Sequence, residues 1–243
     1  MKILSLRAAI MVTTLVMLIV VISACAPKAV GIWRDPEFTP SKLNSVPLVL
    51  GGIGVRGDDE KAKATLRPLL DSLAWSTLST ELPESNLAPI HYCRNKIGTD
   101  ALTKIVNKFE VDGLLDSEDL APLQSAWAPD GSCLIFGRVV EDRVTSEEKY
   151  SEKGNYIENK RTIMIYFAVY DAATCRQLWN GGFSLTRSGY SDSEPENTSS
   201  TLSDFAVGLL LNFLSPPDPE IPPAGDMITA ICRSFARSLA GKE

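Results

Sequence analysis

Three segments in the second half of the chain have the hydrophobic pattern of β-strands: residues 133–140, 161–170 and 177–185. In the second segment both alternating sets of side chains are apolar, which is typical of a central strand covered on two faces. In the third, Trp179, Phe183 and Leu185 share one face and polar residues share the other, so a half-buried strand is predicted. A turn at residues 171–174 is expected to join these last two strands.

The first half of the chain combines one strand with helices. An apolar run at residues 46–52 predicts a buried strand. A helical period then opens at Asp58 and Asp59, with apolar positions at Leu66, Leu69, Leu70, Leu73, Thr77 and Leu78. Pro68 lies inside this period and predicts a kink or a later helix start. Residues 86–93 are a weaker strand candidate and residues 112–126 are ambiguous, whereas amphipathic helices are expected at 100–109, 205–214 and 227–239.

These elements predict a single α/β (α+β) domain with a mixed or antiparallel sheet flanked by helices. The predicted divisions are a signal peptide at 1–24, a lipidated tether at 25–45, the α/β domain at 46–215, and a Pro-rich linker with a C-terminal helix packing on the domain at 216–243. Two polar stretches, 141–160 and 188–200, are expected to be a projecting hairpin end and a loop of disordered composition.

The first 24 residues have the three parts of an export signal. Lys2 and Arg7 begin it, an apolar run at 8–22 follows, and Ser23 and Ala24 end it. A membrane-spanning helix is the alternative. However, the apolar stretch is at the short end of the spanning range, and no basic stop follows it. Cleavage between Ala24 and Cys25 is therefore predicted.

The tetrad Ile22-Ser23-Ala24-Cys25 resembles the bacterial lipobox. That resemblance implies a diacylglycerol on the Cys25 thiol and an acyl chain such as palmitate on its amino group. Two or three chains anchor a protein durably, whereas one chain does not. Ala26, in place of the Asp associated with inner-membrane retention, implies the outer membrane and its periplasmic face; the inner membrane and the cell surface are the alternatives. An ordinary signal followed by a stray Cys25 thiol is the competing interpretation.

Four further cysteines, Cys93, Cys133, Cys175 and Cys232, form an even set in a chain predicted to be exported. Disulfides persist outside the cytoplasm, so these residues are candidates for pairing, with three pairings open. Cys232 lies on the apolar face of the last predicted helix, so a buried free thiol is the alternative there.

Charge narrows the classes of partner. The chain has 24 Lys and Arg against 30 Asp and Glu, and the mature chain keeps 22 against 30, a net charge of −8. This balance argues against nucleic-acid binding. It also argues against nonspecific attraction to anionic lipid, so the acyl group must supply the membrane attachment.

Three short motifs suggest chemistry, but none predicts a catalytic, cofactor or metal site. The segment from Gly52 to Gly57 matches G-x-G-x-x-G, with Asp71 about 20 residues from its start. Because antiparallel strands follow it, a glycine-rich strand-to-helix turn is favoured. Trp127-Ala-Pro-Asp-Gly131 resembles a blade motif of periplasmic β-propellers but occurs once, which indicates a turn. His91, the only histidine, and Cys93 would share a face of the predicted strand as a base and thiol, but no residue to orient the imidazole is identifiable.

The segment from Arg161 to Asn180 combines an apolar strand, an Asp and Thr turn, and a strand bearing Leu178-Trp179. It resembles a signature of several bacterial lipoproteins, among them the periplasmic domain of the curli secretion channel and the activators of penicillin-binding proteins. Cys175 replaces the glycine usual in that turn. The resemblance implies a sheet flanked by helices and does not carry over pore formation.

The resulting hypothesis is a non-enzymatic, lipid-anchored envelope protein that binds or regulates a protein partner on the periplasmic side. The hairpin end from Arg143 to Lys160 and the strand face near Arg176 and Asn180 are the candidate contact surfaces. One alternative is an envelope hydrolase built on the carboxylates Asp112, Asp116 and Glu118. Another is a structural subunit of a larger outer-membrane assembly.

Overall fold

The computed structural model describes residues 26–57, 59–151, 154–191 and 221–242. The expected signal segment, Cys25 and the helix expected at 205–214 lie outside the described residues. Most of the loop expected at 188–200 also lies outside them.

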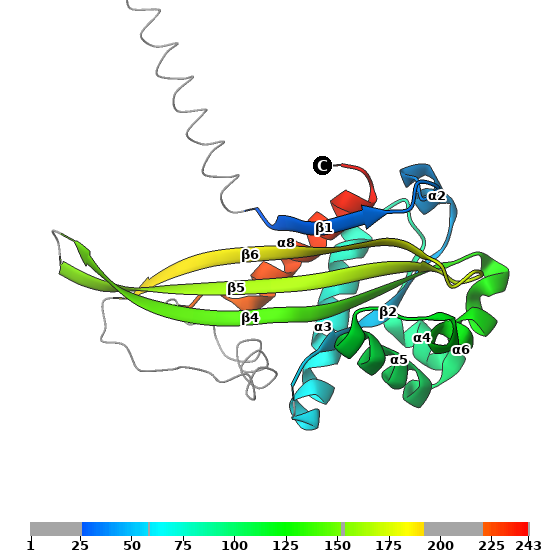
Figure 1. Ribbon diagram of the computed structural model, residues 1–243, viewed down its shortest axis with the longest axis horizontal. Helices are drawn as coiled ribbons and strands as arrows, with labels where there is room; N and C mark the ends of the chain where they lie inside the picture. The colour runs from blue at the N-terminus through cyan, green and yellow to red at the C-terminus, as the bar shows by residue number, and fades with distance from the viewer. Residues whose placement is uncertain (1–25, 58, 152–153, 192–220, 243) are drawn as a thin grey trace, which may run out of the picture.

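Six strands form one mixed sheet in the described chain (Figure 1). They are β1 (Lys28–Arg34), β2 (Leu48–Val55), β3 (Leu87–Ala88), β4 (Cys133–Ser151), β5 (Gly154–Asp171) and β6 (Gln177–Ser191). Their spatial order is β1-β6-β5-β4-β2-β3. Strand β2 runs parallel to β3 and β4, and the other neighbours are antiparallel. The predicted α+β class with a mixed sheet is confirmed.

Helices cover both faces of this sheet (Figure 1). One layer contains α3 (Glu60–Glu81) and α8 (Ala224–Leu239), and the other contains α4 (Ile90–Ile97), α5 (Thr99–Asp112) and α6 (Ser117–Trp127). Short helices α2 (Pro40–Ser45) and η1 (Ala128–Asp130) complete the described elements. Strand β5 contributes to both cores: Ile165 and Phe167 pack towards α3 and α8, whereas Ala168 and Tyr170 pack towards the other layer. The prediction of a central strand with two apolar faces is therefore confirmed.

The segment expected to be a tether belongs to the domain. Residues 28–34 form β1, which pairs with β6, and Phe38 and Leu43 are buried in the core. The sequence concealed this strand because β1 is exposed along most of its length and has no buried apolar set.

The expectations of a strand at 86–93 and of a later helix start at Pro68 were wrong, and that for 141–160 was partly right. Only Leu87 and Ala88 of the strand expected at 86–93 form a strand, because α4 begins at Ile90, directly after the N-cap residue Pro89. The segment 141–160, expected to be a projecting polar hairpin end, does project as a hairpin, but its two sides continue the paired ladder of β4 and β5. Helix α3 runs without a break through Pro68.

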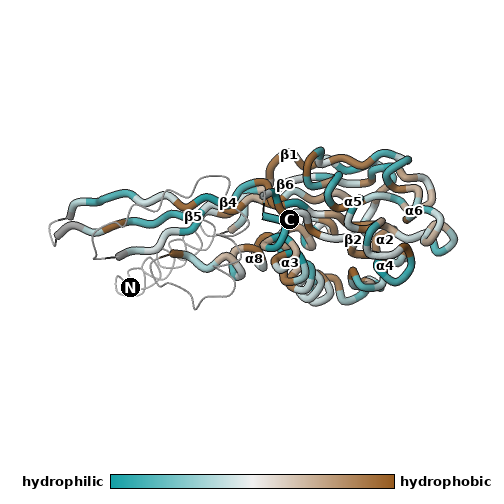
Figure 2. The backbone as a smooth tube through the Cα atoms, turned by 90° about the horizontal axis from the view of Figure 1, so that it is seen from below, coloured by the Kyte–Doolittle hydropathy of each residue, from teal (hydrophilic) through white to brown (hydrophobic). Residues whose placement is uncertain are grey.

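The outer ends of β4, β5 and β6 project beyond the helices, and we call this part of the sheet the arm (Figures 1 and 2). At its base Arg161 and Asp142 form a buried pair, with 2.8 Å between Nε and Oδ1. Farther out, the Lys160 ammonium lies 3.0 Å from the Glu158 carboxylate and 3.8 Å from that of Glu147. Of these contacts, Arg161–Asp142 and Lys160–Glu147 join β5 to β4. Cross-strand polar pairs of this kind stabilise a sheet that has little apolar surface to bury.

The glycines of β2 allow helices to approach the strand closely. Gly52 has φ +135°, and a Cβ there would lie 3.0 Å from side-chain carbons of Ile90 and Val106. A Cβ on Gly54 would lie 2.7 Å from the Cβ of Glu110. The absence of both side chains lets α4 and α5 pack directly on the backbone of β2.

Replacing Gly54 with Ala is expected to lower the free energy of unfolding by about 1–3 kcal/mol, since the new methyl group overlaps Glu110 and displaces α5. Urea denaturation followed by circular dichroism measures this loss. Ser72→Ala, on an exposed position of α3, is the control and should leave the midpoint unchanged. An unaltered midpoint for Gly54→Ala would show that α5 is not held against β2 in this way.

Candidate functional site

The four cysteines expected to pair are free thiols in the structure. Cys93, Cys133 and Cys232 are buried, and burial raises the pKa of each thiol to about 12. Cys93 belongs to the core under α4–α6, whereas Cys133 and Cys232 belong to the core under α3 and α8. The disulfide expectation is thus contradicted: these three residues behave as small apolar side chains within the two cores.

His91 and Cys93 do not form a base and thiol pair. Both lie on α4, where residues two apart point in different directions, unlike residues on a strand. The His91 side chain is exposed, and the Cys93 thiol is buried 3.7 Å from the carbonyl oxygen of Leu50.

Two of the three carboxylates of the hydrolase alternative, Asp112 and Asp116, are engaged in local structure. Asp116 caps α6 by accepting hydrogen bonds from the backbone N–H groups of Glu118 and Asp119, each at 2.9 Å. The Asp112 carboxylate lies 2.7 Å from the Lys108 ammonium. Asp112 and Glu118 face one groove between α5 and α6, together with Lys104 and Lys108. No cluster of three His, Cys, Asp or Glu suited to a metal ion occurs within residues that the structure describes.

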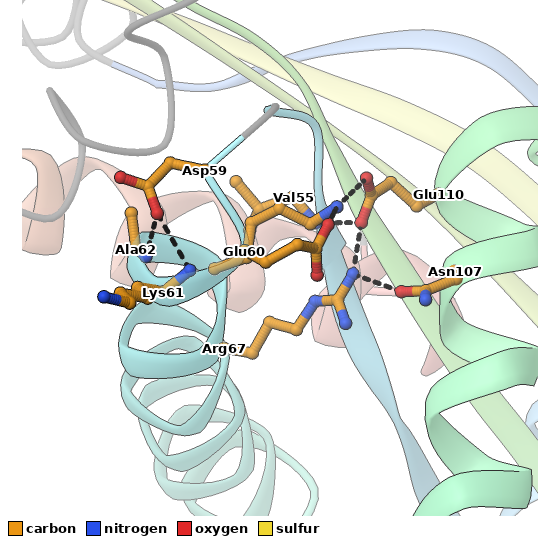
Figure 3. Close-up of polar contacts among 9 residues, drawn as sticks. Val55, Asp59, Glu60, Lys61, Ala62, Arg67, Asn107 and Glu110 are labelled. Atoms are coloured by element: carbon orange, nitrogen blue, oxygen red, sulfur yellow. Dashed lines mark hydrogen bonds and ion pairs between the residues drawn. The ribbon is translucent and has the colours of Figure 1, made fainter.

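The glycine motif is a strand-to-helix connection whose helix terminus is already capped. Asp59 accepts hydrogen bonds from the backbone N–H groups of Lys61 and Ala62 at 2.8 and 3.0 Å (Figure 3). These N–H groups are the ones that would face a phosphate in a dinucleotide-binding turn. The Asp59 carboxylate therefore occupies the position of that anion.

Next to this connection, Glu110 receives several donors at the edge of β2 (Figure 3). Its carboxylate accepts a hydrogen bond from the backbone N–H of Val55 at 3.1 Å and from the Arg67 guanidinium at 2.6 Å. The Lys63 ammonium lies 3.2 Å from its other oxygen. Glu110 and Lys63 are both buried, so each compensates the other's charge.

Asp71 has the same role two residues earlier along β2. Its carboxylate accepts a hydrogen bond from the backbone N–H of Ile53 at 2.9 Å and lies 3.5 Å from the Arg94 guanidinium. The side chain is 3% exposed, and burial raises the pKa of Asp71 to about 6, against the opposing effects of the Ile53 hydrogen bond and of Arg94. Asp71, the acidic residue about 20 positions after the start of the glycine motif, therefore completes the hydrogen bonding of a strand.

Sequence reasoning missed Glu110, although a signal for it was present. Glu110 follows Val106 by four residues, so it lies on the apolar face of α5 beside Leu102, Ile105 and Phe109. A carboxylate on such a stripe is buried, and a buried carboxylate requires a donor or a cation.

The sheet face beneath α4–α6 continues beyond these helices onto β5, β6 and β1. Arg138, Tyr166, Gly182 and Val30 form one row across four strands, and Met164, Ser184 and Lys28 form another. The side chains of Met164, Tyr166, Asn180 and Ser184 are only half-buried. We call these four residues the open face.

The open face is continuous with the end of α5. Arg138 donates a hydrogen bond to the carbonyl oxygen of Val111 at 3.1 Å, and its guanidinium lies 5.5 Å from the ring centre of Tyr166. Val111 and Leu114 are large apolar side chains that remain exposed there. An aromatic ring, a thioether and two aliphatic side chains therefore border a half-covered sheet.

Of the two residues predicted to mark a contact surface, Asn180 lies on the open face and Arg176 does not. The Asn180 amide donates a hydrogen bond to Gln177 at 2.7 Å. The Arg176 guanidinium is paired with Asp35, and this contact lowers the pKa of the Asp35 carboxyl. Arg176 thus joins the start of β6 to the segment after β1.

No protein-family model matches this chain, and no curated protein matches it. Among solved structures, it is similar to the lipoprotein GNA1162 from Neisseria meningitidis, at 13% identity over 70% of this chain and 97% of the other, with a TM-score of 0.33. It is also similar to a PelC dodecamer from Paraburkholderia phytofirmans, at 17% identity over 79% of this chain and 97% of the other, with a TM-score of 0.32. A third similar structure is the hypothetical protein CT253 from Chlamydia trachomatis, at 12% identity over 81% of this chain and 96% of the other, with a TM-score of 0.42. At TM-scores below 0.5, these likenesses assign neither a family nor a function.

Within the described ranges, none of the helices has the length and apolar character needed to cross a bilayer.

The raised pKa of Asp71 predicts a specific pH dependence of stability. The folded protein holds a proton on Asp71 up to about pH 6, whereas the unfolded chain loses it near the ordinary value of 3.8. The folded state therefore binds more protons in this interval. The contribution of Asp71 to stability falls as the pH rises through it, by at most about 3 kcal/mol.

The measurement compares wild type with Asp71→Asn, which keeps an oxygen to accept the Ile53 N–H but does not titrate. The difference in unfolding free energy, wild type minus variant, should decrease between pH 4 and pH 6 and become constant above pH 7. A difference that is the same at all these values would contradict the burial of an ionisable Asp71.

Proposed function

We propose that this chain is a lipid-anchored bacterial envelope protein that binds a protein partner through its open face, on the periplasmic side of the outer membrane. The observation that carries the proposal is the half-covered sheet face of β5 and β6, bordered by the exposed Val111 and Leu114. Aromatic and long apolar side chains at the margin of a sheet are the composition found in the centre of protein interfaces.

The anchor part of the proposal rests on sequence and on where the sheet begins. Ile22-Ser23-Ala24-Cys25 matches the lipobox pattern, and only Ala26 and Pro27 separate Cys25 from β1. A lipid on Cys25 would hold the domain directly at a bilayer, without a tether.

The proposed role is non-catalytic. Asp116 caps a helix, Asp112 pairs with Lys108, and Glu110 and Asp71 hold the edge of β2. These four carboxylates have structural partners, which supports a binding module rather than a hydrolase.

The open face suits a partner that presents apolar side chains. Tyr166 and Met164 lie on β5, and Leu114 extends the apolar border towards α5. Two polar groups beside them are already paired, because the Asn180 amide donates to Gln177 and Arg138 Nη1 donates to carbonyl oxygens at the end of α5. Burial by a partner would therefore leave these two groups with their hydrogen bonds.

The anchor is tested by Cys25→Ala. Wild-type protein extracted from membranes should have an intact mass that corresponds to a chain starting at Cys25 with two or three acyl chains attached. The variant should lack that mass and separate from outer-membrane fragments on flotation. A wild-type chain without lipid, or one cut elsewhere, would overturn the anchor.

The binding surface is tested by photo-crosslinking in cells, with a benzophenone side chain placed at Tyr166, at Leu114, or at exposed Thr80 on α3 as the matched control. Positions 166 and 114 should give the same discrete adduct, and position 80 should not. Tyr166→Ala should then lower recovery of that partner by about 10-fold or more, the effect of removing a central aromatic contact. Adducts that are absent, or identical at all three positions, would contradict a binding role for the open face.

A further inference from the structure

Strand β1 presents three exposed apolar side chains directly after the proposed lipid anchor. Val30, Ile32 and Trp33 are 44%, 36% and 45% exposed. They belong to a seven-residue strand that starts at Lys28, three residues after Cys25. Because a trans peptide advances the chain by at most about 3.6 Å per residue, the start of β1 lies within about 11 Å of an acylated Cys25.

The three side chains do not share one face of the sheet. Val30 and Trp33 pair with Gly182 and Asn180, which places them on the side of the open face. Ile32 lies over Gly181, on the opposite side, since a Cβ built on Gly181 would come within 2.9 Å of its Cγ1. Only a surface that approaches β1 edge-on contacts all three residues.

Addition of another strand to β1 is opposed by the backbone. Gly31 has φ +59°, and the register between β1 and β6 shifts between Val30 and Trp33. Such a bulge interrupts the row of N–H and C=O groups that an added strand would need. A lipid surface can contact these side chains without hydrogen bonding to the backbone of β1.

The charge of this segment differs from that of the chain. No acidic residue occurs from Ala26 to Arg34, while the mature chain carries a net charge of −8. Lys28 stands at the start of the strand, and Trp33 lies near its end. A segment with a tryptophan, basic residues and apolar residues has the composition that proteins place at the interface between water and lipid.

We propose that the edge formed by Val30, Ile32 and Trp33 is seated in the headgroup region of the bilayer, where it fixes the orientation of the domain. This inference rests on the proposed lipid anchor at Cys25. The acyl chains hold the protein at the membrane, and β1 sets which edge of the sheet faces the lipid.

The structure provides a matched pair of reporters on opposite edges of the sheet. Trp33 lies on β1, and Trp75 is similarly exposed (37%) with its indole nitrogen 3.4 Å from the carbonyl oxygen of Leu87 in β3. The other two tryptophans, Trp127 and Trp179, are buried. The edges at β1 and β3 are separated by five strand spacings, about 24 Å.

The experiment places the full mature, acylated protein in vesicles of phosphatidylethanolamine and phosphatidylglycerol. Tryptophan emission is compared with and without lipids brominated near the headgroup end of their chains. Wild type and Trp75→Phe should be quenched, and Trp33→Phe should lose nearly all of the quenching. Phenylalanine at an exposed position should leave the melting temperature unchanged, which checks that the variants fold.

Flotation of the same vesicles separates the two proposals. Protein that floats but shows no quenching, or shows equal quenching in Trp33→Phe, would overturn the seated edge and leave the anchor intact. A blue shift of Trp33 that grows with protein density and is insensitive to bromine would instead assign the edge to contact with a second copy. Protein that does not float would overturn the anchor and the seated edge together.

Discussion

The arrangement of the helices depends on two carboxylates that complete the outer edge of β2. Strand β3 is only two residues long, so beyond it the backbone N–H groups of Ile53 and Val55 have no strand to pair with. Asp71 and Glu110 accept these hydrogen bonds instead. A buried N–H group without an acceptor costs about 1–3 kcal/mol, so the two carboxylates are required where they lie.

This requirement in turn determines the charges of α3. Lys63, Arg67 and Asp71 follow one another at four-residue spacing, so they line one side of the helix and face α5. Leu66, Leu70 and Ala74 form the adjacent stripe of the helix and pack in the core beneath the sheet. Helix α3 therefore covers one sheet face and also closes the edge of β2, which is why it joins the two helical layers.

The sequence predicted those strands in which buried side chains recur at every second residue. The strands at 133–140, 161–170 and 177–185 lie inside β4, β5 and β6, and the two-faced apolar pattern of 161–170 identified a central strand. The strand pairing within 141–160 and β1 were not predicted. In 141–160, polar contacts such as the cross-strand pair of Lys160 with Glu147 replace apolar alternation, and β1 is exposed along most of its length. The hydrophobic pattern of one segment does not indicate which side chains of a neighbouring strand it will pair with, because those pairs depend on the register between the strands.

The candidate site was predictable to a smaller extent. Asn180 was singled out and does lie on a half-covered face, whereas Tyr166 was assigned only to a central strand, because its exposure depends on where α5 ends. If β1 rests on the bilayer, the strands run along the membrane surface and the sheet rises from β1 to β3 over about 24 Å. The open face then stands upright beside the membrane with its lower border in lipid. In that orientation a partner that binds Tyr166 approaches parallel to the membrane surface, and it lies within about 24 Å of the bilayer.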